Sequence, residues 1–264
     1  MLIKFIAVLV ILTGIAGLVL PIIPGILLIT IGVLLFFRDK TSKIREILPE
    51  KMPSAAAVIY SHVLPKILLP YYKMIADQVR LKPGDRLLDV GMGPGILAME
   101  IASRSPSSSI TGIDISEKMV EIANDNRTRE GSGNIGNIEF KIMDAKRLEF
   151  SDGCFDLILS TGSFHHWKDP MKVISEIYRC LKKGSEAWIY DGFSNATNED
   201  IARCVKRIWN IFPTAGMVRY VLSIHGYQQK EYEAIVSDIL HNTPFKEGVL
   251  EVRGIMARIR LKKA

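Results

Sequence analysis

The chain has 264 residues, 48% of them hydrophobic, and a formal net charge of +6, a length that accommodates one large domain or one domain with an appendage. Its lysines and arginines are scattered through residues 38–264 in short runs, which argues against a dedicated nucleic-acid-binding stripe. Three cysteines (Cys154, Cys180 and Cys204) lack the spacing of a metal site or a disulfide framework, and their odd number favours a reducing compartment.

The N-terminal segment is apolar, with no charged side chain in residues 5–37. This run is far longer than the apolar core of about 7–15 residues in a secretory signal, and longer than the roughly 20 residues that one membrane-spanning helix needs. Pro21, Pro24 and Gly25 interrupt it where a turn would stand. We therefore expect two helices, residues 2–20 and 26–37, joined at Pro21–Gly25 as a membrane hairpin within residues 1–40.

Basic residues flank both ends of this hairpin. Lys4 precedes it, and four more follow it (Arg38, Lys40, Lys43 and Arg45). By the positive-inside rule both ends lie in the cytoplasm, so the rest of the chain is expected there, anchored to the membrane through residues 2–37. A single span and a buried hairpin of a soluble protein are the alternatives.

Residues 41–80 are predicted to be a helical connector, broken repeatedly by proline. Residues 55–64 and 67–79 carry apolar side chains at helical spacing. Such helices could lie at the membrane interface, cover one edge of a binding pocket, or simply pack against a sheet.

From residue 81 to residue 264, short apolar strands alternate with amphipathic helices, which is typical of a doubly wound α/β sheet. The predicted helices cover 96–102, 116–130 with Ser116 as its cap, and 170–181. The predicted strands cover 86–90, 109–114, 137–143, 155–161 and 186–190.

Residues 192–243 read as a helical insertion that could form a lid. We expect helices over 198–212, 214–224 and 228–240. The strands 245–252 and 255–261 then form a hairpin around Arg253-Gly254 and complete a seven-stranded sheet with an antiparallel last strand.

A glycine-rich turn follows the first strand, with Gly91, Gly93 and Gly95 before a helix. Backbone can approach a ligand closely at such a turn, next to a helix N-terminus. The third glycine comes one place too early for the G-x-G-x-x-G pattern of dinucleotide sites. Asp89 stands two places before the first glycine, where a carboxylate suits a ligand with an ammonium group and a positive sulfur rather than a pyrophosphate.

The segment Leu87–Gly95 resembles motif I of the class I S-adenosylmethionine-dependent methyltransferases. Segments 111–116 and 143–145 are similar to the ends of that family's second and third strands, and 155–170 resembles the fourth-strand motif of the subgroup that includes the ubiquinone/menaquinone-biosynthesis C-methyltransferases. The resemblance covers residues 81–193 and implies a Rossmann-like methyltransferase fold. Leu181–Ser185 departs from it, because Lys183 stands where the family usually has proline.

The resemblance implies a role for each residue at these strand ends. Asp89 and the three glycines would hold the methionine part of S-adenosyl-L-methionine, and Asp114 would hold the ribose. Ile115 would lie against the adenine face, with Asp144 and Ala145 at the adenine edge. Ser160 and Thr161 would face the ligand and the mouth of the substrate site.

Methyl transfer asks little of the protein, because the methyl group is already activated on a sulfonium and in-line alignment is the main contribution. A general base is needed only where the acceptor must lose a proton. His165 and His166 are the candidates for that role, and Phe164 with Trp167 is a candidate pocket wall. The two histidines lack further ligands at recognisable spacing, so no metal is expected.

These features together predict transfer of a methyl group to a small, lipophilic or membrane-associated acceptor. One alternative is a membrane-tethered cofactor-binding or scaffold protein without catalysis. Another is a methyltransferase acting on protein or nucleic acid, although Ser160–Ser163 stands where amino-directed DNA enzymes carry Asp/Asn-Pro-Pro-aromatic.

Overall fold

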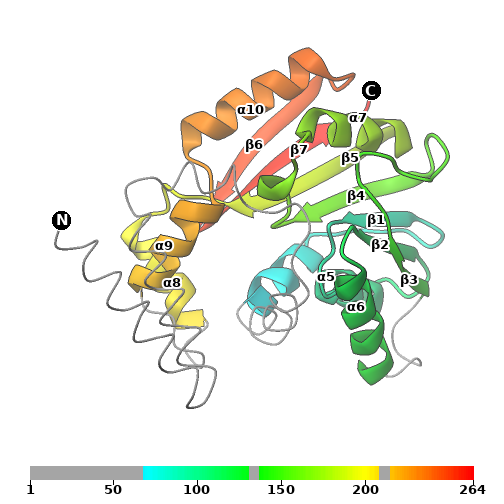
Figure 1. Cartoon of the computed structure of the whole chain (residues 1–264), viewed down its shortest axis with the longest axis horizontal. Helices are drawn as coiled ribbons and strands as arrows, with labels where there is room; N and C mark the ends of the chain where they lie inside the picture. Colours follow the sequence, from blue (N-terminus) through cyan, green and yellow to red (C-terminus); the bar gives the residue numbers. More distant parts are fainter. Residues whose placement is uncertain (1–67, 131–136, 208–214) are drawn as a thin grey trace. The chain divides into compact units, whose positions relative to one another are not determined.

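The computed structural model describes residues 68–130, 137–207 and 215–264 (Figure 1). The predicted hairpin at 1–40 and most of the connector lie outside these residues. Within the described ranges, no helix is long and apolar enough to cross a membrane.

Seven strands form one sheet in the order β3-β2-β1-β4-β5-β7-β6. All neighbouring pairs from β3 to β5 are parallel, and β7 runs antiparallel to both β5 and β6, as the sequence predicts. The strands are β1 (Arg86–Val90), β2 (Ser109–Asp114), β3 (Asn137–Ile142), β4 (Phe155–Thr161), β5 (Leu181–Gly192), β6 (Glu247–Arg253) and β7 (Met256–Lys262).

Strand β5 begins five residues earlier than predicted, at Leu181. Leu181 pairs with Phe155 and Glu186 pairs with Leu157, so the register shifts between the two pairs. Gly184, inside the shift, has a φ of 80° and donates its N–H to the carbonyl of Lys263. The turn that departs from the family's pattern is therefore absorbed as an irregularity within the strand.

Three helices and one short 3₁₀ turn connect the parallel strands: α5 (Ile96–Arg104), α6 (Glu117–Glu130), η3 (Phe164–His166) and α7 (Pro170–Cys180). Asp169 caps α7, because its side chain accepts from the N–H of Lys172. Ser116 stands directly before α6, as predicted, but its side chain does not cap the helix. The Ser116 hydroxyl makes no hydrogen bond, and the carbonyl of Ser116 accepts from Met119 and Val120 instead.

The apolar core divides into two clusters of buried side chains. One includes Leu88, Phe155 and residues of α7, while the other includes Leu87 and residues of α5. Residues 68–76 form the described part of a helix whose Ile75 is fully buried in the second cluster. This part of the connector therefore packs against the sheet, as one of the predicted alternatives had it.

The insertion forms helices α8 (Asn198–Arg207), α9 (Ala215–His225) and α10 (Gln229–Asn242), close to their predicted positions. Helix α8 contacts α9, and α10 lies along β6 and against α7 (Figure 1). The bridge between Phe193 and Tyr227 ties the α9–α10 junction to the residue after β5. The described part of the insertion is thus attached to the carboxyl end of the sheet.

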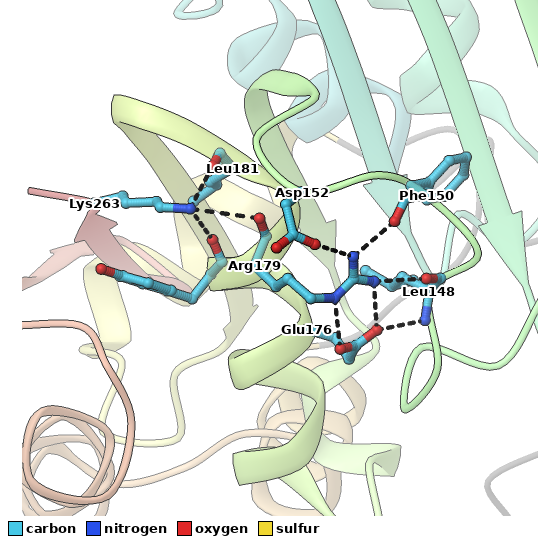
Figure 2. A network of polar contacts seen from close by, with 8 residues as sticks. Leu148, Phe150, Asp152, Glu176, Arg179, Leu181 and Lys263 are labelled. Atoms are coloured by element: carbon cyan, nitrogen blue, oxygen red, sulfur yellow. Dashed lines mark hydrogen bonds and ion pairs between the residues drawn. The ribbon is translucent and has the colours of Figure 1, made fainter.

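Two basic side chains, Arg179 and Lys263, make hydrogen bonds around the C-terminal end of α7 (Figure 2). The Arg179 guanidinium donates to the carbonyls of Leu148 and Phe150 and pairs with Asp152 and Glu176. The Lys263 ammonium donates to three carbonyls near the end of α7 and the start of β5 (Tyr178, Arg179 and Leu181). Carbonyls at a helix C-terminus lack intrahelical partners, and the Lys263 ammonium satisfies those of Tyr178 and Arg179.

Candidate active site

The predicted site residues come together at one edge of the sheet. Strand register places Asp89 of β1 beside Gly112 of β2 and Leu159 of β4, and it places Asp114 beside Ile142 of β3. The carboxyl ends of these four parallel strands therefore meet. The strand order also reverses between β1 and β4, which is where doubly wound sheets bind ligands.

Unpaired polar atoms gather at this same edge. Buried polar groups are hydrogen-bonded in the great majority of cases, so a buried polar atom without a hydrogen-bond partner indicates where a ligand could bind. Every residue with such an atom within the described ranges lies in or just after the carboxyl end of β1, β2, β4 or β5. The atoms are Asp89 Oδ1 and Oδ2, Ser116 Oγ, Thr161 Oγ1, His166 Nδ1 and Ser194 Oγ.

Asp89 is the most demanding of these groups. Asp89 is only 1% exposed to solvent, and neither of its carboxylate oxygens has a hydrogen-bond partner among the described residues. Burial, and then the nearby charge of Asp114, raise the pKa of the Asp89 carboxyl to about 7. A cationic group bound beside Asp89 would supply the missing partner and favour the ionised form.

The three glycines serve the loop in different ways. Gly91, Gly93 and Gly95 have φ angles of 71°, 54° and 75°, which side chains rarely allow. A Cβ on Gly91 would lie 2.5 Å from Ser163 Oγ, and one on Gly95 would lie 2.8 Å from the Phe140 ring. A Cβ on Gly93 would meet nothing within 4 Å. Gly93 therefore presents backbone to open space, while its two neighbours allow close packing.

Asp114 connects this loop to the end of β2. Its Oδ2 accepts from the N–H of Gly93 at 3.0 Å, and its Oδ1 accepts from the N–H of Ser116 at 2.8 Å. Burial raises the pKa of the Asp114 carboxyl, while these two hydrogen bonds oppose the rise. Each oxygen retains a lone pair for a further donor.

The third predicted acid, Asp144, lies at the more open rim. Its side chain is 43% exposed, with Oδ2 3.7 Å from the Lys146 ammonium, and its Oδ1 accepts from the Lys146 N–H. Ile115 and Ala145 are half-buried after the ends of β2 and β3. Half-buried apolar groups near a partly exposed acid are compatible with binding a flat heterocycle at this rim.

Ser160 and Thr161 end β4 next to the glycine loop. Ser160 is fully buried, and its Oγ lies 2.7 Å from Ser163 Oγ in a hydrogen bond. Ser163 Oγ donates to the carbonyl of Val90, the residue before the loop. The Ser160 hydroxyl therefore supports the loop from behind, whereas the Thr161 hydroxyl has no partner.

His165 is held rigidly by a carboxylate that the sequence analysis did not single out. Its backbone N–H donates to Asp191 Oδ2 at 3.0 Å, and its Nδ1 lies 2.9 Å from both oxygens of Asp191. Burial opposes ionisation of Asp191, but its interactions with His165 keep the carboxyl pKa below the usual range. His165 Nε2 in turn lies 2.9 Å from Nδ1 of His225, at the end of α9.

His166 lies beside this pair in an apolar setting. Burial, followed by the neighbouring His165 and His225, lowers the pKa of His166 to about 3, and the pKa of His225 falls to about 4 for the same main reason. Both rings are therefore neutral at neutral pH. Phe164 packs edge-on against Trp167 and Tyr227, with ring centroids 5.2 and 5.8 Å apart, and forms the apolar wall next to them.

Known proteins share this part of the chain. Residues 88–189 match the family model described as a methyltransferase domain. The 27-O-demethylrifamycin SV methyltransferase of Amycolatopsis mediterranei is 36% identical over 117 residues, which is 44% of this chain and 42% of that protein. A ubiquinone/menaquinone biosynthesis C-methyltransferase of Geotalea daltonii is 36% identical over 120 residues, 45% of this chain and 50% of that protein.

A solved structure extends the likeness beyond the motifs. A protein of Methanococcus maripaludis, described provisionally as an S-adenosyl-L-methionine-dependent methyltransferase, aligns with a TM-score of 0.66 at 25% identity over 80% of this chain and 93% of that chain. Residues 88–189 thus match a methyltransferase domain in sequence, within an α/β fold that this solved structure shares. The chain spans about half the length of the curated relatives that it matches.

S-adenosylmethionine is the cofactor of this methyltransferase domain, and the chemistry of the site fits it. The cofactor brings an ammonium group and a sulfonium, and Asp89 is a buried carboxylate without a partner. Its ribose brings hydroxyl donors, and Asp114 retains free lone pairs at the next strand end.

Three residues of the methyltransferase domain were missed by the sequence analysis. Asp191 ends β5 much as Asp114 ends β2, so an acid at a strand end was an available signal. Ser163 follows the fourth strand, but only its packing against Gly91 reveals its role. No sequence signal marks His225, because it meets His165 across 60 residues.

Proposed function

We propose that the methyltransferase domain passes the methyl group of S-adenosylmethionine to a small, lipophilic acceptor by in-line displacement at a membrane surface. The observation that carries the cofactor half of this proposal is Asp89, whose two buried carboxylate oxygens lack any partner within the described residues. A cofactor ammonium placed there would gain a charge-assisted hydrogen bond and relieve the cost of the buried charge.

The remaining cofactor contacts follow from the order of the strand ends. We assign the methionine part to Asp89 and the loop Gly91–Gly95, and the ribose to Asp114. The adenine would lie against Ile115, with Asp144 and Ala145 at its edge. Thr161, at the end of β4, has a buried hydroxyl oxygen without a partner and would face the cofactor and the acceptor.

The chain's own contribution to the reaction is positioning. The bound cofactor supplies the activated methyl group, so the protein gains rate chiefly by holding the acceptor atom in line with it. A general base stays a prediction for His165 and His166. His166, with a pKa of about 3, is a poor proton acceptor at neutral pH, and both ring nitrogens of His165 are engaged.

Two observations support a small and lipophilic acceptor. The names of the relatives refer to rifamycin and to ubiquinone or menaquinone, which are small molecules. The aromatic rings of Phe164, which belongs to η3, and of Trp167 and Tyr227 pack together near the carboxyl edge of the sheet. Trp209 and Phe212, which also contribute aromatic character to the insertion, lie outside the described residues.

The membrane anchor is part of the same proposal. An uncharged run over residues 5–37 exceeds what one bilayer crossing requires, and the flanking basic residues favour a cytoplasmic methyltransferase domain. A tether of this kind would keep the domain beside acceptors that dissolve in the bilayer.

Calorimetry with S-adenosylmethionine tests the cofactor half, and failure to bind would remove the basis for catalysis. The acceptor half is tested by incubating the full-length protein with methyl-labelled cofactor and, separately, isolated membranes or cytosolic extract. We expect label in an organic-extractable product of the membrane fraction. Label that enters only water-soluble metabolites would contradict a lipophilic acceptor while leaving the methyltransferase intact.

A further inference from the structure

Three of the four histidines within the described residues meet at one point. His165 and His166 belong to η3, and His225 ends α9. One potential ligand atom from each of the three lies within 4.8 Å of the other two. The fourth, His241, is exposed on α10 and offers a natural control.

Asp191 determines which nitrogen of His165 faces this cluster. A carboxylate only accepts hydrogen bonds at neutral pH, so Nδ1 of His165 must carry the proton that Asp191 accepts. Nε2 of His165 is then left with a lone pair, and it points at His225. A carboxylate that holds the far nitrogen of an imidazole is the usual support for a metal-binding histidine.

The fold holds His225 in place through a contact between two glycines. A Cβ on Gly226 would lie 2.6 Å from the carbonyl oxygen of Leu222 and 2.9 Å from the backbone of Gly192. The N–H of Tyr227 donates to the carbonyl of Gly192. This close approach attaches the end of α9 to the end of β5, one residue beyond Asp191. The position of His225 is thus set by backbone contacts rather than by its own flexible side chain.

His166 completes the cluster with an unsatisfied atom. Its Nδ1 is buried and has no hydrogen-bond partner. Its ring centroid lies 4.1 Å from that of His165 and 6.2 Å from that of His225. Two observations thus stand together: His166 has a buried nitrogen without a partner, and Asp191 orients His165 so that its Nε2 carries a lone pair. A bound cation would explain both.

We propose that His165, His166 and His225 bind a divalent transition-metal ion of the zinc type. Imidazole nitrogen suits such ions, and three protein ligands leave a fourth position for water or an oxygen of another ligand. Zn–N bonds of about 2.0–2.1 Å in tetrahedral geometry separate neighbouring nitrogens by about 3.3 Å. The 2.9 Å between His165 Nε2 and His225 Nδ1 would therefore need to open only slightly.

Metal titration of the full-length protein tests the site. The protein is purified in detergent through a tag without histidine, stripped with a chelator, and titrated with Co²⁺ as a spectroscopic probe. We expect one equivalent to bind, with the visible absorption of a tetrahedral ion, and Zn²⁺ to displace it. Asp191→Asn should weaken binding about 10–100-fold, as loss of a supporting carboxylate does at known sites.

Variants of the ligands separate this site from other histidines. His166→Gln and His225→Gln should each abolish stoichiometric binding, while His241→Ala should leave it unchanged. Retained S-adenosylmethionine binding in the two glutamine variants would show that they fold. Absence of saturable binding by the wild type, or binding that survives both glutamine substitutions together, would overturn the proposal. The first result would leave the three histidines as a hydrogen-bonded chain, and neither result bears on methyl transfer.

Discussion

At the scale of single residues, Asp89 is a buried carboxylate without a hydrogen-bond partner among the described residues, and the proposed cofactor ammonium would supply that partner. Burial without a partner makes the ionised carboxylate unfavourable, and its pKa rises to about 7. The folded-state pKa of Asp89 lies above the unfolded value of 3.8. Its contribution to the free energy of unfolding is therefore most favourable at low pH and becomes steadily less favourable as pH rises from about 4 to 7.

Asp89→Asn should therefore have opposite effects on binding and on stability. Loss of the charged partner should weaken S-adenosylmethionine binding by about 10–100-fold, since hydrogen bonds to charged groups contribute about 1.5–3 kcal/mol. The melting temperature of the cofactor-free protein should rise by a few degrees at pH 8 and show no gain near pH 4. Calorimetry and thermal melts measure the two effects, with the exposed Asp125→Asn of α6 as the matched control. A variant that binds as tightly as the wild type would contradict the assignment.

Cofactor affinity should also depend on pH through the same carboxyl. Below pH 7 a proton competes with the cofactor ammonium for Asp89, so the Kd should rise as pH falls, approaching tenfold per pH unit. Titrations at pH 7.5, 6.5 and 5.5 measure this slope. The slope should disappear in Asp89→Asn, and a slope that persists there would point to another titrating group.

At the scale of elements, the junction between α9 and α10 decides whether the insertion and the sheet form one site. The Gly192–Gly226 contact brings two backbones together, and Tyr232 Oη adds a hydrogen bond to the carbonyl of Gly192 at 2.7 Å. The insertion predicted as a lid is held to β5 at this point, and the hold places His225 over His165.

Gly226→Ala tests this attachment. The added methyl group collides with the carbonyl of Leu222 and with Gly192, which should lower the free energy of unfolding by about 1–3 kcal/mol and weaken the proposed metal binding. Gly216→Ala is the control, because the exposed Gly216 lies in α9, where alanine should stabilise by about 0.5–1 kcal/mol. Chemical denaturation measures both. Equal stability of Gly226→Ala and the wild type would show that the junction is looser than the contact implies.

At the scale of the whole molecule, our proposal gives the apolar N-terminal segment and the methyltransferase domain separate tasks. Residues 5–37 carry no charge, and the α/β domain carries the strand ends that we assign to the cofactor. We therefore expect a change in the first to alter location without altering cofactor binding.

Membrane fractionation of cells that express the full-length chain checks this division. The protein should sediment with membranes, resist high salt, and be released by detergent. The double substitution Val10→Lys and Leu28→Lys should shift it toward the soluble fraction, since each lysine at a helix centre costs about 2.5–3.5 kcal/mol of insertion free energy, while S-adenosylmethionine binding stays unchanged. Release of the wild type by salt alone would contradict a hairpin.

The fold and the meeting of the candidate site residues at one sheet edge could be predicted from sequence, because the signals are local. A buried parallel strand is a short apolar run, and the acids and glycines that follow it lie at the same edge for any doubly wound sheet. The bounds of β2 and β4 match the prediction to the residue. The start of β5 was missed because its first pair is separated from the rest by the irregularity around Gly184.

Only the tertiary structure decided what surrounds the histidines. The sequence determined that His165 and His166 follow the fourth strand, and that Asp89, Asp114 and Asp144 stand at three strand ends. Whether His165 is a free base depends on Asp191, 26 residues away, and on His225, 60 residues away. The pairing of β5 with β4 places Asp191 beside His165, and the approach of Gly226 to Gly192 places His225 there. Both are contacts between distant segments that no local periodicity records.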